Sequence, residues 1–114
     1  MKINKYTFYL HTVNGGEYEF EMCPISDAVK FAEQHECKSG IFLFLEYNPQ
    51  QRGIPRYLFC GETENLLEDI ITYINYAEQK NVVANSFCFY PEPSKYVCKE
   101  VINDIKNNYR FMFS

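Results

Sequence analysis

The stretch that most constrains the fold runs from Gly40 to Ile71 and reads GIFLFLEYNPQQRGIPRYLFCGETENLLEDII. Two apolar runs, Ile41–Tyr47 and Arg56–Cys60, flank a polar bend that contains two prolines and a glycine. The second run leads directly into apolar residues at helical spacing. Length and periodicity therefore predict a strand, a loop, a second strand and a helix in about thirty residues.

A hairpin and a helix are predicted before this stretch. The strands Tyr6–Val13 and Glu17–Met22 flank Asn14-Gly15, a dipeptide that accepts the positive φ angles of a type I′ turn. A helix follows, with Ser26 as its expected N-cap. No linker separates residues 1–39 from residues 40–114, so the hairpin and helix are interpreted as an addition to the core of a single domain, 1–114.

The C-terminal part continues the same alternation. We expect Thr63 to cap a helix over Glu64–Gln79, because six apolar residues recur there at helical spacing. Ala84–Tyr90 is the next predicted strand, and Ser94 is expected to cap a last helix that ends near Asn107. The aromatic residues of the tail, 109–113, alternate and should dock on the core as an extended segment.

Composition restricts the class of protein. Apolar residues make up 46% of the chain and aromatic residues 18%, which predicts a well-filled core without metals or disulfides. The net charge is −4 and the sequence shows no basic cluster. Nucleic-acid binding proteins usually present a basic face to phosphate, so the charge argues against such a ligand.

The cysteines favour a reduced compartment. There are five, no C-x-x-C occurs, and no apolar run has the length of a signal peptide or a membrane span. We therefore expect a cytoplasmic protein with free thiols and no membrane association. Zinc bound by Cys23, His35 and Cys37 is an alternative, although His-x-Cys lacks the usual paired spacing. Cys60 precedes a helix N-terminus, where a thiolate would be stabilised, but a buried and inert Cys60 is favoured.

The central stretch resembles the GIY-YIG endonuclease-type domains. In that family a GIY motif is followed after about ten residues by YIG, then by x-T-x-N-L-x-x-R and a histidine one helical turn later. The matching residues here are Gly40-Ile41-Phe42, Tyr57-Leu58-Phe59-Cys60-Gly61, Thr63, Asn65 and Leu66. The resemblance covers Gly40 to Tyr109. It implies an α/β (α+β) fold with a small antiparallel sheet flanked by helices.

The resemblance also implies a reaction. Family members hydrolyse phosphodiesters with two tyrosines, an arginine, often a histidine, and a carboxylate that holds one divalent metal ion. By spacing, the two tyrosines become Phe42 and Phe59, the arginine becomes Asp69, and the histidine becomes Tyr73. Glu100 on the last predicted helix is the candidate metal carboxylate.

These replacements remove chemical capability. Phenylalanine keeps the ring volume but cannot transfer a proton, and Asp69 would repel the phosphate that an arginine attracts. The sequence therefore predicts a degenerate domain without a cofactor that serves as a binding or regulatory module. Its groove is expected to be formed by Tyr57, Asp69, Tyr73, Tyr76 and Glu100. A protein or a small cationic ligand suits this groove better than nucleic acid.

Two alternatives remain open at this point. The first is a divergent nuclease in which Glu100 binds Mg²⁺ or Mn²⁺ and tyrosines such as Tyr57 or Tyr73 take the missing roles. The second is a small structural or assembly subunit, including a homo-oligomer, held together by its aromatic surface and N-terminal hairpin.

Overall fold

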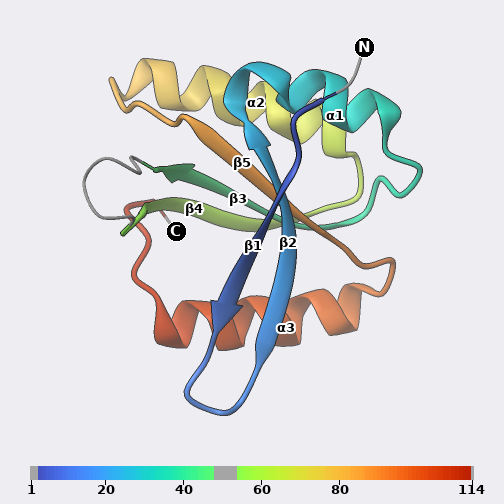
Figure 1. The fold of residues 1–114 in the computed structure, drawn as a ribbon, viewed down its shortest axis with the longest axis vertical. Helices are drawn as coiled ribbons and strands as arrows, with labels where there is room; N and C mark the ends of the chain where they lie inside the picture. Colours follow the sequence, from blue (N-terminus) through green and yellow to red (C-terminus); the bar gives the residue numbers. More distant parts are fainter. Residues whose placement is uncertain (1–2, 48–53, 114) are drawn as a thin grey trace.

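The computed structural model describes residues 3–47 and 54–113 and contains one five-stranded antiparallel sheet with the order β1-β2-β5-β3-β4. Helices α1 and α2 lie on one face of the sheet and α3 on the other (Figure 1). The strands are β1 Tyr6–His11, β2 Glu17–Pro24, β3 Gly40–Glu46, β4 Arg56–Thr63 and β5 Ser86–Pro91, and the helices are η1 Ile25–Asp27 (a 3₁₀ turn), α1 Ala28–Gln34, α2 Leu66–Gln79 and α3 Lys95–Asn108. The α+β class is thus confirmed. Most of the polar bend, residues 48–53, lies outside the described residues.

The predicted central strands pair as expected. β3 and β4 are antiparallel, with Phe42 opposite Gly61 and Phe44 opposite Phe59, and the register shifts after Phe44. β3 also pairs with β5 in antiparallel sense. β4 and β5 therefore run parallel with β3 between them, and α2 is the crossover that joins them. This arrangement buries β3 from Gly40 to Leu45.

The alternation of side chains along the strands divides the core into two apolar layers. One layer packs under α1 and α2 and includes Phe42, Phe87 and Phe89. The other packs under α3 and includes Leu43, Cys88 and Ile105. Because strand residues two apart point to the same face, continuous apolar runs such as Ile41–Leu45 fill both layers at once.

The N-terminal hairpin extends this sheet from β5, where Met22 pairs with Cys88. Its loop differs from the prediction. The Gly15 N–H donates to the Thr12 carbonyl at 3.0 Å, and Gly15 alone in the loop has a positive φ, of 84°. The loop is therefore a type I turn followed by a left-handed glycine, a bulge-type hairpin loop, and the expected type I′ turn at Asn14-Gly15 is wrong.

Helix α2 begins two residues later than predicted. Asn65 is its N-cap and accepts a hydrogen bond from the Glu68 N–H at 3.4 Å. Thr63 instead ends β4; its hydroxyl accepts from the Asn65 N–H at 3.1 Å and donates to the Asp69 carboxylate. At the other end of the chain, Ser94 caps α3 as expected by accepting from the Val97 N–H at 3.3 Å.

The C-terminal tail docks along β4. The N–H groups of Met112 and Phe113 donate to the carbonyls of Tyr57 and Leu58, at 3.0 and 2.9 Å. The predicted docking on the core is therefore confirmed for these residues, but the predicted extended conformation is not, because Met112 lies in a bend. None of the helices in the described ranges has the length and apolarity needed to cross a membrane.

Candidate functional site

Three of the positions at which the resemblance places catalytic side chains form a cluster of packed rings. Phe42 on β3 is 2% exposed, and its ring centroid lies 5.5 Å from that of Phe59 on β4 and 5.4 Å from that of Tyr73 on α2. The rings of Phe59 and Tyr73 are closer still, at 3.8 Å. A Cβ at Gly61 would lie 2.7 Å from the Phe59 ring, so this glycine makes room for the ring. The cluster is a well-packed edge of the core.

The hydroxyl groups near this cluster are not activated. Burial, together with smaller contributions from the neighbouring Tyr76 hydroxyl and Asp69 carboxylate, raises the pKa of Tyr73 to about 12. A phenol with this pKa stays protonated at neutral pH. Phe42 and Phe59 carry no titratable group at all. The ring cluster therefore offers packing and ring faces rather than a proton-transfer group.

Asp69, Tyr73 and Tyr76 lie on one flank of α2. One carboxylate oxygen of Asp69 accepts the hydrogen bond from Thr63, which itself is only 4% exposed. The ring of Tyr76 packs against Tyr73 and against Phe113 of the tail, with centroids 6.0 and 5.5 Å apart. The ammonium group of Lys80 lies 5.7 Å from the Tyr76 ring centroid. This ring therefore already accepts a cation from the chain itself.

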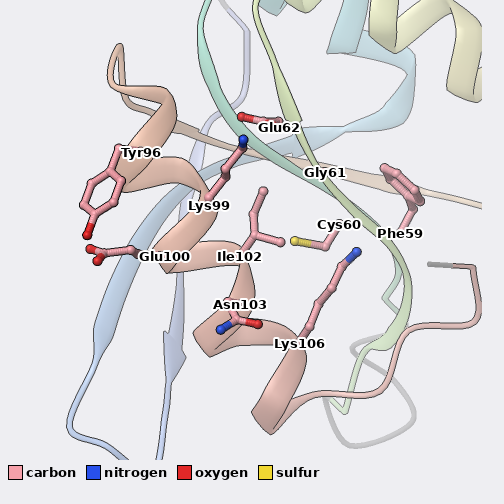
Figure 2. A pocket seen from close by; sticks show the side chains of 10 residues that line it. All are labelled: Phe59, Cys60, Gly61, Glu62, Tyr96, Lys99, Glu100, Ile102, Asn103 and Lys106. Atoms are coloured by element: carbon pink, nitrogen blue, oxygen red, sulfur yellow. The ribbon is translucent and has the colours of Figure 1, made fainter.

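A groove of about 750 Å³ lies on the other face of the sheet, between β4 and α3 (Figure 2). Its wall on the strand side is the segment Phe59–Glu62, and its wall on the helix side is one face of α3. Cys60 and Ile102 form the apolar floor, while the Phe59 ring points away from α3 towards the ring cluster. The groove and the ring cluster therefore adjoin the same part of β4 from its two faces.

The charged groups of the groove are arranged unevenly. Glu100 is engaged by the Tyr96 hydroxyl, and this hydrogen bond raises the pKa of Tyr96. Lys99 and Lys106 extend from α3 towards β4 (Figure 2), and neither forms an ion pair with a described residue. Burial raises the pKa of the Cys60 thiol to about 12, although the nearby Lys106 lowers it. Two cations thus face the strand without an ion pair to the described residues, although Glu62 of β4 lines the same groove, and the Cys60 thiol stays protonated at neutral pH.

The five residues expected to form one groove are separated by the sheet. Asp69, Tyr73 and Tyr76 belong to α2, whereas Glu100 lies in the groove on the α3 face. Tyr57 also belongs to the α3 face, where it packs on Tyr109 and Phe111 of the tail with centroids 5.0 and 5.5 Å away. The sequence could not reveal this division, because periodicity shows that a helix has an apolar face but not which side of the sheet it covers.

The residues of the zinc alternative have protein partners in the structure. The His35 Nε2 lies 2.7 Å from a Glu21 carboxylate oxygen, and its Nδ1 accepts a hydrogen bond from the Cys37 N–H at 3.2 Å. Cys23 is buried, and burial raises its pKa to about 12. Within residues 3–47 and 54–113, no group of three or more His, Cys, Asp or Glu side chains is arranged to hold a metal ion.

Comparison with protein-family models, curated proteins and solved structures returns no match.

Sequence reasoning missed Lys99 and Lys106. They are seven residues apart, which is two turns of a helix, so they lie on the same face of α3 beside its apolar stripe. A search for adjacent basic residues overlooks such a pair. Plotting the polar residues of the last helix by helical position would have found it.

The burial of the thiols leads to a testable prediction. All five cysteines are free, and Cys37 is the one with a partly exposed side chain. Burial raises the pKa of Cys23 and Cys60 to about 12 and that of Cys88 well above its ordinary value. Since the thiolate is the reactive form, we expect one thiol to react quickly with Ellman's reagent at pH 8 and the rest only after denaturation, giving five in total. A native Cys60 that reacts as fast as Cys37 would contradict this assignment of burial.

Proposed function

We propose that the protein is a non-catalytic GIY-YIG-like binding or regulatory module. The observation that carries the proposal is the ring cluster of Phe42, Phe59 and Tyr73. At these positions the resemblance implies two tyrosines and a histidine, which can transfer protons, and here three rings pack against each other instead. The module binds without transforming its ligand.

Charge supports a protein, or a small cationic ligand, over nucleic acid. Asp69 holds the position at which the resemblance implies an arginine, and Tyr73 and Tyr76 follow it along the same flank of α2. The other oxygen of the Asp69 carboxylate accepts no hydrogen bond from the described residues. A carboxylate beside ring faces suits a basic side chain of a protein partner or an amine. The chain's net charge of −4 opposes a polyanion.

Asp69→Arg tests this assignment. The substitution replaces repulsion of phosphate by attraction at a partly exposed site, where each charge contributes about 1 kcal/mol or less. We expect affinity for a short DNA duplex to rise roughly five-fold at low salt and affinity for a basic peptide to fall by a similar factor. Fluorescence anisotropy with labelled duplex and labelled peptide measures both.

Asp69→Asn is the matched control. It keeps the side-chain volume and a hydrogen-bond acceptor for Thr63 but removes the charge, so its affinities should fall between those of wild type and Asp69→Arg. If wild type already prefers the duplex and the arginine changes nothing, Asp69 does not face the ligand and the proposed α2 flank is rejected.

A further inference from the structure

The outer edge of β4 is partly unpaired. β4 is the last strand in the sheet order, so one of its edges has no neighbouring strand. Among the described residues, hydrogen bonds from outside the sheet reach this edge at Tyr57 and Leu58, from the C-terminal tail. The register shift that leaves Leu58 without a partner on β3 turns the carbonyls of both Tyr57 and Leu58 to this edge. Strand backbone groups alternate in direction from Leu58 onward, so Cys60 and Glu62 turn their N–H and C=O groups outward as well. No backbone group of the described residues pairs with them there.

The tail shows what kind of ligand this edge accepts. Met112 and Phe113 donate main-chain hydrogen bonds of 3.0 and 2.9 Å to it, although Met112 lies in a bend and the tail forms no strand there. The remaining edge, Phe59–Glu62, continues in the same line and forms one wall of the groove between β4 and α3. An open strand edge that borders a groove is the arrangement in which an added peptide strand gains both main-chain hydrogen bonds and side-chain pockets.

The surroundings of this edge select the side chains of such a strand. Successive residues of an added strand point to opposite faces of the sheet. On the α3 face they would meet Lys99 and Lys106, which lack ion-pair partners among the described residues. On the α2 face they would meet the rings of Phe59 and Tyr73. Acidic and apolar residues in alternation therefore complement the two sides.

The opposite edge of the sheet is a weaker candidate. β1 is also an edge strand, and among the described residues no backbone group from outside the sheet pairs with it. However, Tyr6 and Tyr9 on β1 are 57% and 49% exposed, so the side chains of a strand added there would meet little packed surface beside them. A strand added there would gain main-chain hydrogen bonds but little selection of side chains.

We propose that the edge of β4 at Phe59–Glu62 binds an extended peptide segment of a partner protein, with acidic side chains towards α3 and apolar side chains towards the Phe59 and Tyr73 rings. This inference rests on the proposed binding function and names the chemistry of its protein partner. The segment continues the sheet beyond the tail and pairs its main chain with Cys60 and Glu62.

The test uses an eight-residue capped peptide of alternating Val and Glu as the probe, with a Val and Lys peptide as its counterpart. Amide chemical shifts of the full chain are followed by two-dimensional NMR at low salt. We expect the acidic peptide to shift the amides of Cys60 and Glu62 and to bind roughly ten-fold more tightly than the basic one. N-methylation of alternate peptide nitrogens should abolish the shifts, because it removes main-chain donors.

The second part of the experiment reverses the charge of the two lysines on α3. The double variant Lys99→Glu with Lys106→Glu should lose the preference for the acidic peptide, whereas Arg110→Glu should keep it. Arg110 is an exposed cation outside this groove, and Arg110→Glu changes the net charge by −2, so it controls for the charge change of each single lysine reversal. Shifts confined to β1, or no shift at Cys60 and Glu62 with either peptide at millimolar concentration, would overturn the proposal. That result would not reject the broader proposal of a non-catalytic binding module, which is rejected instead if the protein cleaves DNA.

Discussion

Gly40→Ala should destabilise the protein by about 3 kcal/mol or more, because the added methyl has no space. A Cβ at this position would lie 2.2 Å from the Tyr90 carbonyl oxygen and 3.0 Å from the Glu92 nitrogen. Both are backbone atoms of the neighbouring segment and cannot rotate away. The Glu92 N–H donates to the Ser39 carbonyl at 3.0 Å, so separating the two segments also breaks a hydrogen bond at the end of β5.

Thermal and urea unfolding of wild type and Gly40→Ala measure this effect. For a chain of this size, we expect the Tm of Gly40→Ala to fall by roughly 10 °C or more. Gly15→Ala is the control, because it places the same methyl in open space at a φ of +84°. It should cost about 1 kcal/mol, from the left-handed backbone alone. Equal costs at the two positions would show that β3 and β5 are not as closely packed at Gly40 as the structure has them.

Phe42→Ala is the second substitution with a large expected effect, about 3–5 kcal/mol. The Phe42 ring contacts Phe44, Phe59 and Tyr73 and is almost fully buried, so its removal leaves a cavity between β3 and α2. Tyr76→Ala, on the exposed flank of the same cluster, should cost about 1 kcal/mol. Urea unfolding of both variants gives the comparison.

Phe42→Tyr distinguishes a packing position from a vacant catalytic one. The new hydroxyl would enter an apolar cluster, and we expect a loss of about 1–3 kcal/mol for burying it without a partner. If Phe42→Tyr is as stable as wild type while Phe42→Ala is also nearly neutral, the position opens to solvent and the ring cluster is not part of the core.

The order of elements could be predicted because each one carries its own signal. Glu17–Met22 alternates, Leu66–Ala77 repeats at helical spacing, and Ser94 provides a cap, and all three patterns appear in the structure. The hairpin loop could not be predicted, since tertiary contacts decide it. Thr12 and Tyr18 both donate to the Asp104 carboxylate of α3, at 2.8 and 2.6 Å.

These contacts explain the change of turn type. The Gly16 N–H donates to the Thr12 hydroxyl at 3.0 Å, and a Cβ at Gly16 would lie 2.7 Å from the Asp104 carboxylate. The Val13 N–H also donates to the Asn108 side chain at 2.9 Å. A tight type I′ turn at Asn14-Gly15 would give up this docking on α3, so long-range hydrogen bonds override the local preference of Asn-Gly.

The candidate site was predictable in its residues but not in its geometry. Spacing identified Phe42, Phe59 and Tyr73, and the structure brings these three rings together. It places Glu100 across the sheet from Asp69, because α2 and α3 cover opposite faces (Figure 1). A sequence pattern specifies which residues share a helix face, whereas the side of the sheet depends on the handedness of each connection.

The most direct test of the central claim is an endonuclease assay on single-stranded, duplex and branched DNA with Mg²⁺ or Mn²⁺. We expect no cleavage at any practical protein concentration, since the ring cluster lacks proton-transfer groups and Asp69 repels phosphate. Glu100→Ala is assayed in parallel to separate activity of this chain from a contaminant. Cleavage by wild type that disappears in Glu100→Ala would contradict the account and identify the protein as a metal-dependent nuclease.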